Sequence, residues 1–218
     1  MTTSSTYTLD PSIADFTDEA FERCGVDPAT LTMRHLRSAR RSSNLLLSDW
    51  ANRGCKLWAI EQETVDCVDG TAAYNMDAGT IAILEMVVRR SSVDTPVYPM
   101  SRVEYLAIPN KTQEGLPSKF YFNRQKTTQT ITLWTVPENS TDDLIFYRLR
   151  RMQDVTAASE TADLPYEWFE AFASGLAAKL AVKFAPDRLA HLVAMAADSF
   201  SAAYTDQRER ADLYITIG

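Results

Sequence analysis

The segment from Leu31 to Gly54 constrains the fold most, because it carries two helical stripes of opposite character. Small and apolar residues recur at helical spacing on one side of it: Leu36, Ala39, Ser43, Leu46, Leu47 and Trp50. Arginines occupy a different side: Arg34, Arg37 and Arg41, with Arg40 beside them. The segment therefore predicts a long amphipathic helix that ends at Gly54, with one buried side and one basic side that is either solvated or in contact with a partner.

Three further helices are predicted outside this segment. The first runs from Pro11 or Ser12 to Arg23, with Asp10 as its expected N-cap and Gly25 as its stop. Because the link over residues 27–30 is short, this helix and the arginine-bearing one are expected to form an antiparallel hairpin. Aromatic and leucine residues at helical spacing predict another helix over residues 168–184, and Pro186 is expected to begin the last one.

Between these helical parts the hydrophobic pattern changes to the period of strands. Strands are expected at residues 57–60, 64–68, 81–90, 120–124, 130–134 and 144–149. Pro99 limits residues 97–100 to a sheet edge, and Ser101 is expected to cap a helical turn through Leu106. The predicted class is α+β, mainly α: an antiparallel helical bundle of two N-terminal and two C-terminal helices, an inserted antiparallel β domain and a C-terminal extension. The expected parts are residues 1–55 (helical hairpin), 56–160 (β-rich domain), 161–210 (C-terminal helices packing on the N-terminal pair) and 211–218 (C-terminal arm).

Charge is distributed unevenly along a chain whose net charge is −7. The first helix carries an expected acidic face of Asp15, Asp18, Glu19 and Glu22. The second carries the basic face of Arg34, Arg37, Arg40 and Arg41. Such separation suits an oligomer in which the acidic face of one copy meets the basic face of the next. It suits equally well an intramolecular pairing of adjacent helices.

Motifs for catalysis or cofactor binding are missing from the sequence. The three cysteines, Cys24, Cys55 and Cys67, form no CxxC pair, and His35 and His191 lie far apart, so neither a metal nor a cofactor is expected. Phosphate-loop, dinucleotide-binding, GxSxG and HExxH patterns do not occur. The chain is therefore not expected to be an enzyme, although a hydrolase that uses Cys24 or His35 stays open as an alternative. No apolar run approaches the roughly 20 residues of a membrane span, and the first residues do not form a signal peptide.

The C-terminal tip combines apolar and β-prone residues after a charged stretch: Leu213, Tyr214, Ile215, Thr216 and Ile217. In a monomer such a tip usually frays. Alternatively it adds to a partner as a strand, which recruits main-chain hydrogen bonds and side-chain pockets. The tip is therefore a candidate docking arm.

Several phrases of the chain resemble the head–tail adaptor (connector, or head-completion) proteins of tailed bacteriophages. They are Phe21-Glu22-Arg23-Cys24-Gly25, the runs over residues 36–42 and 44–54, and the stretches 105–112, 147–154, 164–165 and 177–186. The resemblance extends from about Phe16 to about Arg210. It implies a structural virion protein of the neck or tail, made in the host cytoplasm.

The resemblance also implies an assembly. Adaptors of this kind form a dodecameric ring beneath the portal protein, extend the DNA channel, help to retain the genome and bind the downstream tail protein, a nozzle or tail-tube component. The arm from Ala211 to Gly218 is the segment expected to reach the portal, and genomic DNA is expected to pass the lumen without specific binding. Another tail accessory or head-completion role is the alternative. A regulatory DNA binder that uses the arginines is disfavoured by the acidity of the chain and the absence of a helix-turn-helix signature.

Overall fold

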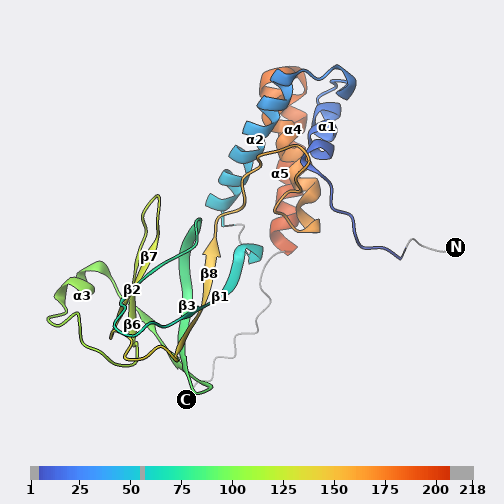
Figure 1. Ribbon diagram of the computed structural model, residues 1–218. Helices are drawn as coiled ribbons and strands as arrows, with labels where there is room; N and C mark the ends of the chain where they lie inside the picture. The colour runs from blue at the N-terminus through green and yellow to red at the C-terminus, as the bar shows by residue number, and fades with distance from the viewer. Residues whose placement is uncertain (1–4, 55–56, 207–218) are drawn as a thin grey trace, which may run out of the picture. The chain divides into compact units, whose positions relative to one another are not determined.

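The computed structural model describes residues 5–54 and 57–206. The described residues form two compact units: a helical unit made of residues 5–54, 57 and 152–206, and a β unit made of residues 58–151 (Figure 1). The α+β class expected from the sequence is confirmed.

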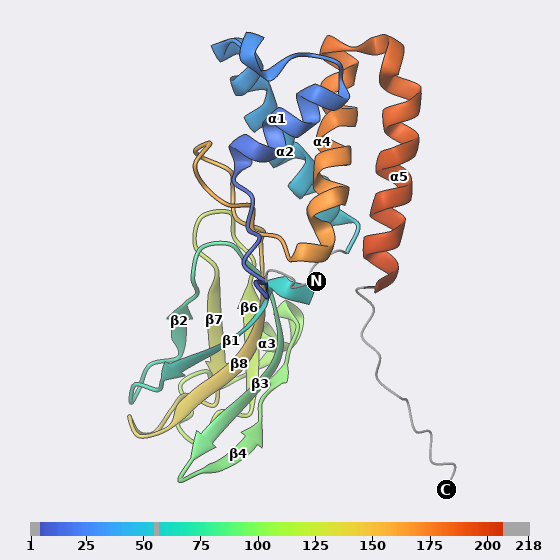
Figure 2. The same ribbon diagram turned by 90° about the vertical axis from the view of Figure 1, so that its right-hand side faces the viewer.

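The helical unit contains four helices: α1 (Ile13–Arg23), α2 (Met33–Asn52), α4 (Phe169–Phe184) and α5 (Leu189–Asp206). Short 3₁₀ turns at Pro28–Thr30, Tyr166–Trp168 and Pro186–Arg188 precede three of them. Helix α4 contacts each of the other three helices, and α1 and α2 each contact α4 more extensively than they contact one another. Figure 2 shows α4 between α5 on one side and the α1–α2 pair on the other.

The N-terminus of α1 differs from the expectation. Ser12, not Asp10, is the N-cap, and Pro11 lies outside the helix. The Ser12 hydroxyl accepts a hydrogen bond from the Asp15 amide at 3.3 Å, and the Asp15 carboxylate accepts one from the Ser12 amide at 2.8 Å. This reciprocal pair satisfies two backbone donors at once, which a cap at Asp10 would not do.

Aromatic side chains fill the core of the helical unit. Phe172 on α4 is fully buried, and its ring meets the Phe16 ring at 5.0 Å and the Trp50 ring at 6.1 Å between centroids. Trp50 also meets Trp168 at 5.0 Å. The aromatic residues predicted to pack on the first two helices therefore do so, and the geometry is edge-on or tilted, as aromatic pairs prefer.

The apolar stripe of α2 is buried at five of its six predicted positions: Ala39, Ser43, Leu46, Leu47 and Trp50. Leu36 is the exception, since it is 39% exposed. This prediction was wrong because Leu36 points toward a groove between α1 and α2 rather than toward α4. Gly54 follows the helix with φ +91°, a left-handed conformation that glycine adopts without strain.

The β unit contains two four-stranded sheets. The first has the order β1-β8-β3-β4 and is antiparallel throughout: β1 (Ile60–Asp66), β8 (Asp143–Arg150), β3 (Thr80–Arg90) and β4 (Val93–Pro96). The second has the order β2-β7-β6-β5: β2 (Ala73–Asn75), β7 (Thr130–Trp134), β6 (Lys119–Asn123) and β5 (Tyr98–Pro99). Helix α3 (Arg102–Ala107) follows β5, capped by Ser101 as predicted.

Two strand predictions need correction. Residues 57–59 form a 3₁₀ turn, and the strands expected at 57–60 and 64–68 are one strand, β1, because pairing with β8 begins at Ile60, opposite Leu149, and continues to Asp66. The second sheet is mixed rather than antiparallel, because β5 pairs with β6 in the parallel direction. Pro99 lies in that edge strand, where a missing ladder donor is tolerated.

Side chains from both sheets share one core in the β unit. Met86 and Val88 of β3 and Leu144 and Phe146 of β8 meet residues of the other sheet, among them Phe120, Ile131 and Leu133. Alternate residues along each strand face this core, which is the expected pattern for two sheets packed face to face.

Arg148 sits in the same alternation of β8 as Leu144 and Phe146, and it is only 8% exposed. Its guanidinium lies 2.9 Å from Glu63, 3.1 Å from Glu61 and 3.4 Å from Asp77. It also donates to the Thr80 hydroxyl at 3.2 Å. Burial raises the pKa of the Glu63 carboxyl, with Arg148 acting in the opposite direction. One buried cation thus holds three carboxylates together.

Replacing that cation destabilises the fold. We expect Arg148→Met to lower the free energy of unfolding by about 2–3 kcal/mol at neutral pH, because Glu63 and Asp77 lose their counter-charge and Glu61 keeps only its ion pair with Arg150. The loss of stability caused by Arg148→Met should become smaller toward about pH 5. The reason is that the carboxylates, which now repel one another, bind protons more tightly in the folded chain than in the unfolded chain, so lowering the pH favours folding. Urea unfolding at neutral pH and at about pH 5 measures the free energy of unfolding of the variant and of the unmodified chain.

The matched control is Arg89→Met, which removes an exposed ion pair with Asp94 on the same sheet. It should change the stability little at either pH. An Arg148→Met variant as stable as the control would contradict the assignment of Arg148 as the counter-charge of this cluster.

Candidate interaction surface

The arginines of α2 lie together on an exposed surface of the helical unit. Arg34, Arg37, Arg40 and Arg41 line one hollow of about 390 Å³. Arg40 donates to the Thr156 carbonyl at 3.1 Å. No carboxylate within residues 5–54 and 57–206 forms an ion pair with any of the four. We call these residues the arginine face.

Helix α4 adds two lysines beside this surface. The Lys183 ammonium donates to the hydroxyls of Ser38 at 3.0 Å and Ser42 at 2.7 Å. Burial lowers the pKa of Lys183, and the positive charges of Arg41 and Lys179 lower it further. Lys179 and Lys183 therefore add positive charge close to Arg41.

The four acidic residues predicted on the first helix all lie exposed on α1, but two of them are engaged within the fold. The Asp15 carboxylate caps α1, and its hydrogen bonds with Ser12 hold the pKa of Asp15 below its usual value. Glu19 forms an ion pair with Arg23 at 2.7 Å. Asp18 and Glu22 form no ion pair with any described residue.

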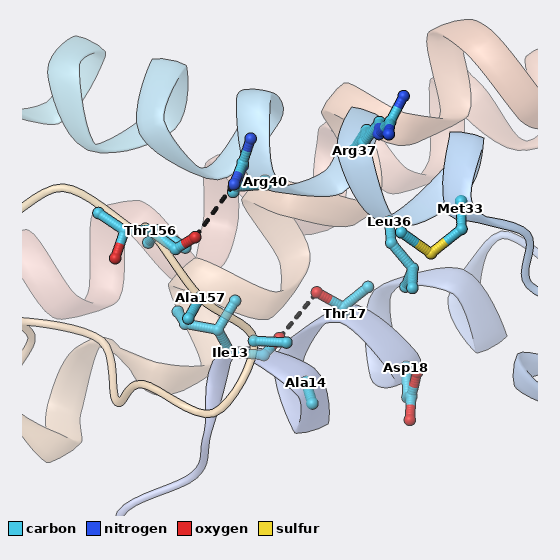
Figure 3. A pocket seen from close by; sticks show the side chains of 12 residues that line it. Ile13, Ala14, Thr17, Asp18, Met33, Leu36, Arg37, Arg40, Thr156 and Ala157 are labelled. Atoms are coloured by element: carbon cyan, nitrogen blue, oxygen red, sulfur yellow. Dashed lines mark hydrogen bonds between the residues drawn. The ribbon is translucent and has the colours of Figure 1, made fainter.

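A groove of about 500 Å³ separates α1 from α2 (Figure 3). Ile13, Ala14, Thr17 and Asp18 line its α1 side, and Met33, Leu36, Arg37 and Arg40 its α2 side. Residues 155–158 form the remaining wall. The groove is therefore largely apolar and is bordered by two arginines of the arginine face.

The wall over residues 155–158 is fixed by hydrogen bonds to both helices. The Asn44 side chain donates to the Val155 carbonyl at 3.0 Å and accepts from the Val155 amide at 2.8 Å. On the other side, the Ala14 amide donates to the Ala158 carbonyl at 2.9 Å. Asn44 was not predicted to matter, because a single polar residue at the edge of a helix gives no sequence signal for a backbone partner more than a hundred residues away.

The remaining predicted sites give no sign of chemistry. Burial raises the pKa of Cys24, and it raises the pKa of Cys67 to about 11, so neither thiol is primed as a thiolate nucleophile. The His35 and Phe184 ring centroids are 4.8 Å apart, and His35 accepts a hydrogen bond from the Thr32 amide. His191 is exposed on α5. Among the residues that the structure describes, no His, Cys, Asp and Glu side chains gather in a group that could hold a metal ion.

Two further expectations concern the membrane and the C-terminus. No helix in the described part of the chain is long and apolar enough to cross a membrane. Cys55 and the predicted docking arm, Leu213, Tyr214, Ile215, Thr216 and Ile217, lie outside the described residues.

Unpaired surface charge around an apolar groove is typical of a protein that acts by binding other proteins. Comparison with family models defines the class further. The chain belongs to the SU10 adaptor protein family, whose model matches residues 7–215. Members are structural head–tail adaptors of phages and components of the virion. No curated protein matches the chain.

The groove wall gives a testable prediction. We expect Asn44→Ala to lower the free energy of unfolding by about 1–3 kcal/mol, because the Val155 amide and carbonyl lose their partners in a partly buried position. Hydrogen exchange of the Val155 amide should become faster, and urea unfolding measures the stability. Asn52→Ala, at an exposed position near the end of α2, is the control and should change neither quantity. Unchanged exchange at Val155 would show that Asn44 does not hold this wall.

Proposed function

We propose that this adaptor assembles as a ring between the portal protein and the downstream tail protein, a nozzle or tail-tube component. The ring would be dodecameric, as the resemblance to connector proteins implies. It would extend the DNA channel, help to retain the genome and offer a platform for tail attachment. Membership of the adaptor family supports a place between head and tail.

The observation that carries the self-association is the arginine face. Four guanidiniums stand together on a chain of net charge −7, and Lys179 and Lys183 add to their field. Like charges at this spacing repel one another, and a neighbouring surface that carries carboxylates would relieve the repulsion. We therefore place the arginine face at the boundary between adjacent copies.

The acidic counterpart includes the α1 residues whose charge is free. Asp15 and Glu19 are held within the fold, which leaves Asp18 and Glu22 of the expected acidic face for contact with another copy. They lie four residues apart on one helix, so a single surface can use both.

The arm from Leu213 to Ile217 is the proposed contact with the portal. Its apolar and β-branched residues suit addition to a partner as an extended strand. Genomic DNA would pass through the ring without specific binding, because an acidic protein repels the phosphate backbone.

Light scattering tests this function directly. The mass of the purified chain should rise by many copies when a portal ring of the same phage is added, and deleting residues 211–218 should abolish the rise. Arg34→Glu, Arg37→Glu and Arg41→Glu together should also abolish it, because the arginine face then repels the carboxylates of its neighbour. Added salt should weaken the assembly of the unmodified chain.

The charge-matched control changes three exposed basic residues of the β unit to glutamate: Arg102, Lys119 and Lys126. This control should assemble as the unmodified chain does. A chain whose mass does not respond to the portal would contradict the ring and would favour another tail accessory or head-completion role.

A further inference from the structure

Helix α5 has an outer face that is unusual for a surface helix. The exposed residues of α5 are Ala190, His191, Val193, Ala194, Ala197, Asp198, Ser201, Ala202, Tyr204 and Thr205. Val193 is 50% exposed and Tyr204 is 38% exposed. Between Leu189 and Thr205, Asp198 is the one Asp, Glu, Lys or Arg in the sequence. A helix that faces only water normally carries charged side chains along that face, so this one is suited to contact with protein.

The groove between α1 and α2 has matching properties. Met33 is 66% exposed and Leu36 is 39% exposed, although both are large and apolar. The groove offers about 500 Å³ between two helices. An apolar helix face docking into such a groove is a recurring mode of protein recognition.

The charges of the two surfaces are complementary. Arg37 and Arg40 border the groove, and no described carboxylate forms an ion pair with either of them. On the α5 side, Asp198 and, just before the helix, Asp187 are exposed. The helix therefore carries one exposed aspartate beside an apolar face, whereas the groove carries two arginines and one aspartate, Asp18, around an apolar floor, so the helix is negative where the groove is net positive.

The positions of the two surfaces on the helical unit indicate which molecule fills the groove. Helix α4 lies between α5 and the α1–α2 pair (Figure 2). Val193 lines a hollow with Leu46 and Trp50 of α2, whereas the groove uses the Leu36 side of α2, so the two surfaces lie on different sides of the helical unit. Two distinct surfaces on different sides of one unit make a head-to-tail contact, and such contacts close into a ring when the rotation fits. We propose that the outer face of α5 of one copy lies in the α1–α2 groove of the next copy. The inference rests on the proposed self-association and assigns α5, in place of Asp18 and Glu22 of α1, as the surface that meets Arg37 and Arg40, because Asp18 itself lines the groove.

Disulfide trapping between two single-cysteine additions tests the contact. One chain carries Leu36→Cys in the groove, the other carries Val193→Cys on α5, and both carry Cys55→Ser, which leaves the buried Cys24 and Cys67 in place. Mixed and mildly oxidised, the two chains should form a heterodimer, whereas neither alone should form a disulfide dimer above background. A single chain with both additions should give a ladder of covalent multimers. Trapping captures even weak association, so no preformed ring is required.

The controls place the same cysteine at other exposed apolar positions. Leu45→Cys on α2 and Val182→Cys on α4 are 63% and 64% exposed and lie outside both surfaces, so their mixtures should stay monomeric. Dimers of Val193→Cys alone would overturn the inference in favour of an α5–α5 contact. Multimers seen by light scattering without the Leu36–Val193 cross-link would overturn the inference and leave the ring standing. Leu36→Cys trapping by a cysteine added at Ile215 would instead assign the groove to the C-terminal arm.

Discussion

Helix α4 has a central segment that is buried on every side, and the helical unit depends on covering this segment, whereas Val182 and Lys183 near its end are exposed. Every residue from Ala171 to Ala177 is buried. A helix of this kind is stable in water only when neighbours shield all its sides. Helices α1, α2 and α5 provide that cover, and Gly175 lets α2 approach so closely that a Cβ there would lie 2.9 Å from the Leu46 side chain.

The groove is a consequence of this packing. Because α1 and α2 each pack on α4 rather than closely on one another, a space is left between them, and the segment around Val155 closes only one part of it. The outer face of α5 is the corresponding consequence on the other side, where α4 covers only one face of the helix. Both surfaces that we assign to self-association therefore follow from the need to bury one central helix.

The arginines of the chain fall into two groups with different physical roles. Arg148 and Arg23 each lie between carboxylates of the fold, at distances from 2.7 to 3.4 Å, and contribute to its stability. The arginine face makes no such pair within the described residues, although Arg40 donates to the Thr156 carbonyl, and we propose that its charge serves contacts with a neighbouring copy.

The sequence predicts features that depend on local pattern. Strand β7 coincides with the predicted range of 130–134, and the cap at Ser101 follows from local chemistry. The exposure of Leu36 could not be predicted, because hydrophobic periodicity does not distinguish a core from a groove. The partners of Arg148 and Asn44 could not be predicted from the sequence either, because they are brought close by strand pairing and by a loop that is distant along the chain. Of the interaction surface, the arginines were predicted and the groove and the face of α5 were not.

A cryo-electron microscopy map of the neck of the assembled phage tests the central claim most directly. Our account predicts a closed ring of this chain between portal and tail, with the arginine face and the α1–α2 groove covered by α5 of the adjacent copy. A map in which the arginine face is open to solvent or turned toward the DNA, away from every other copy, would contradict it.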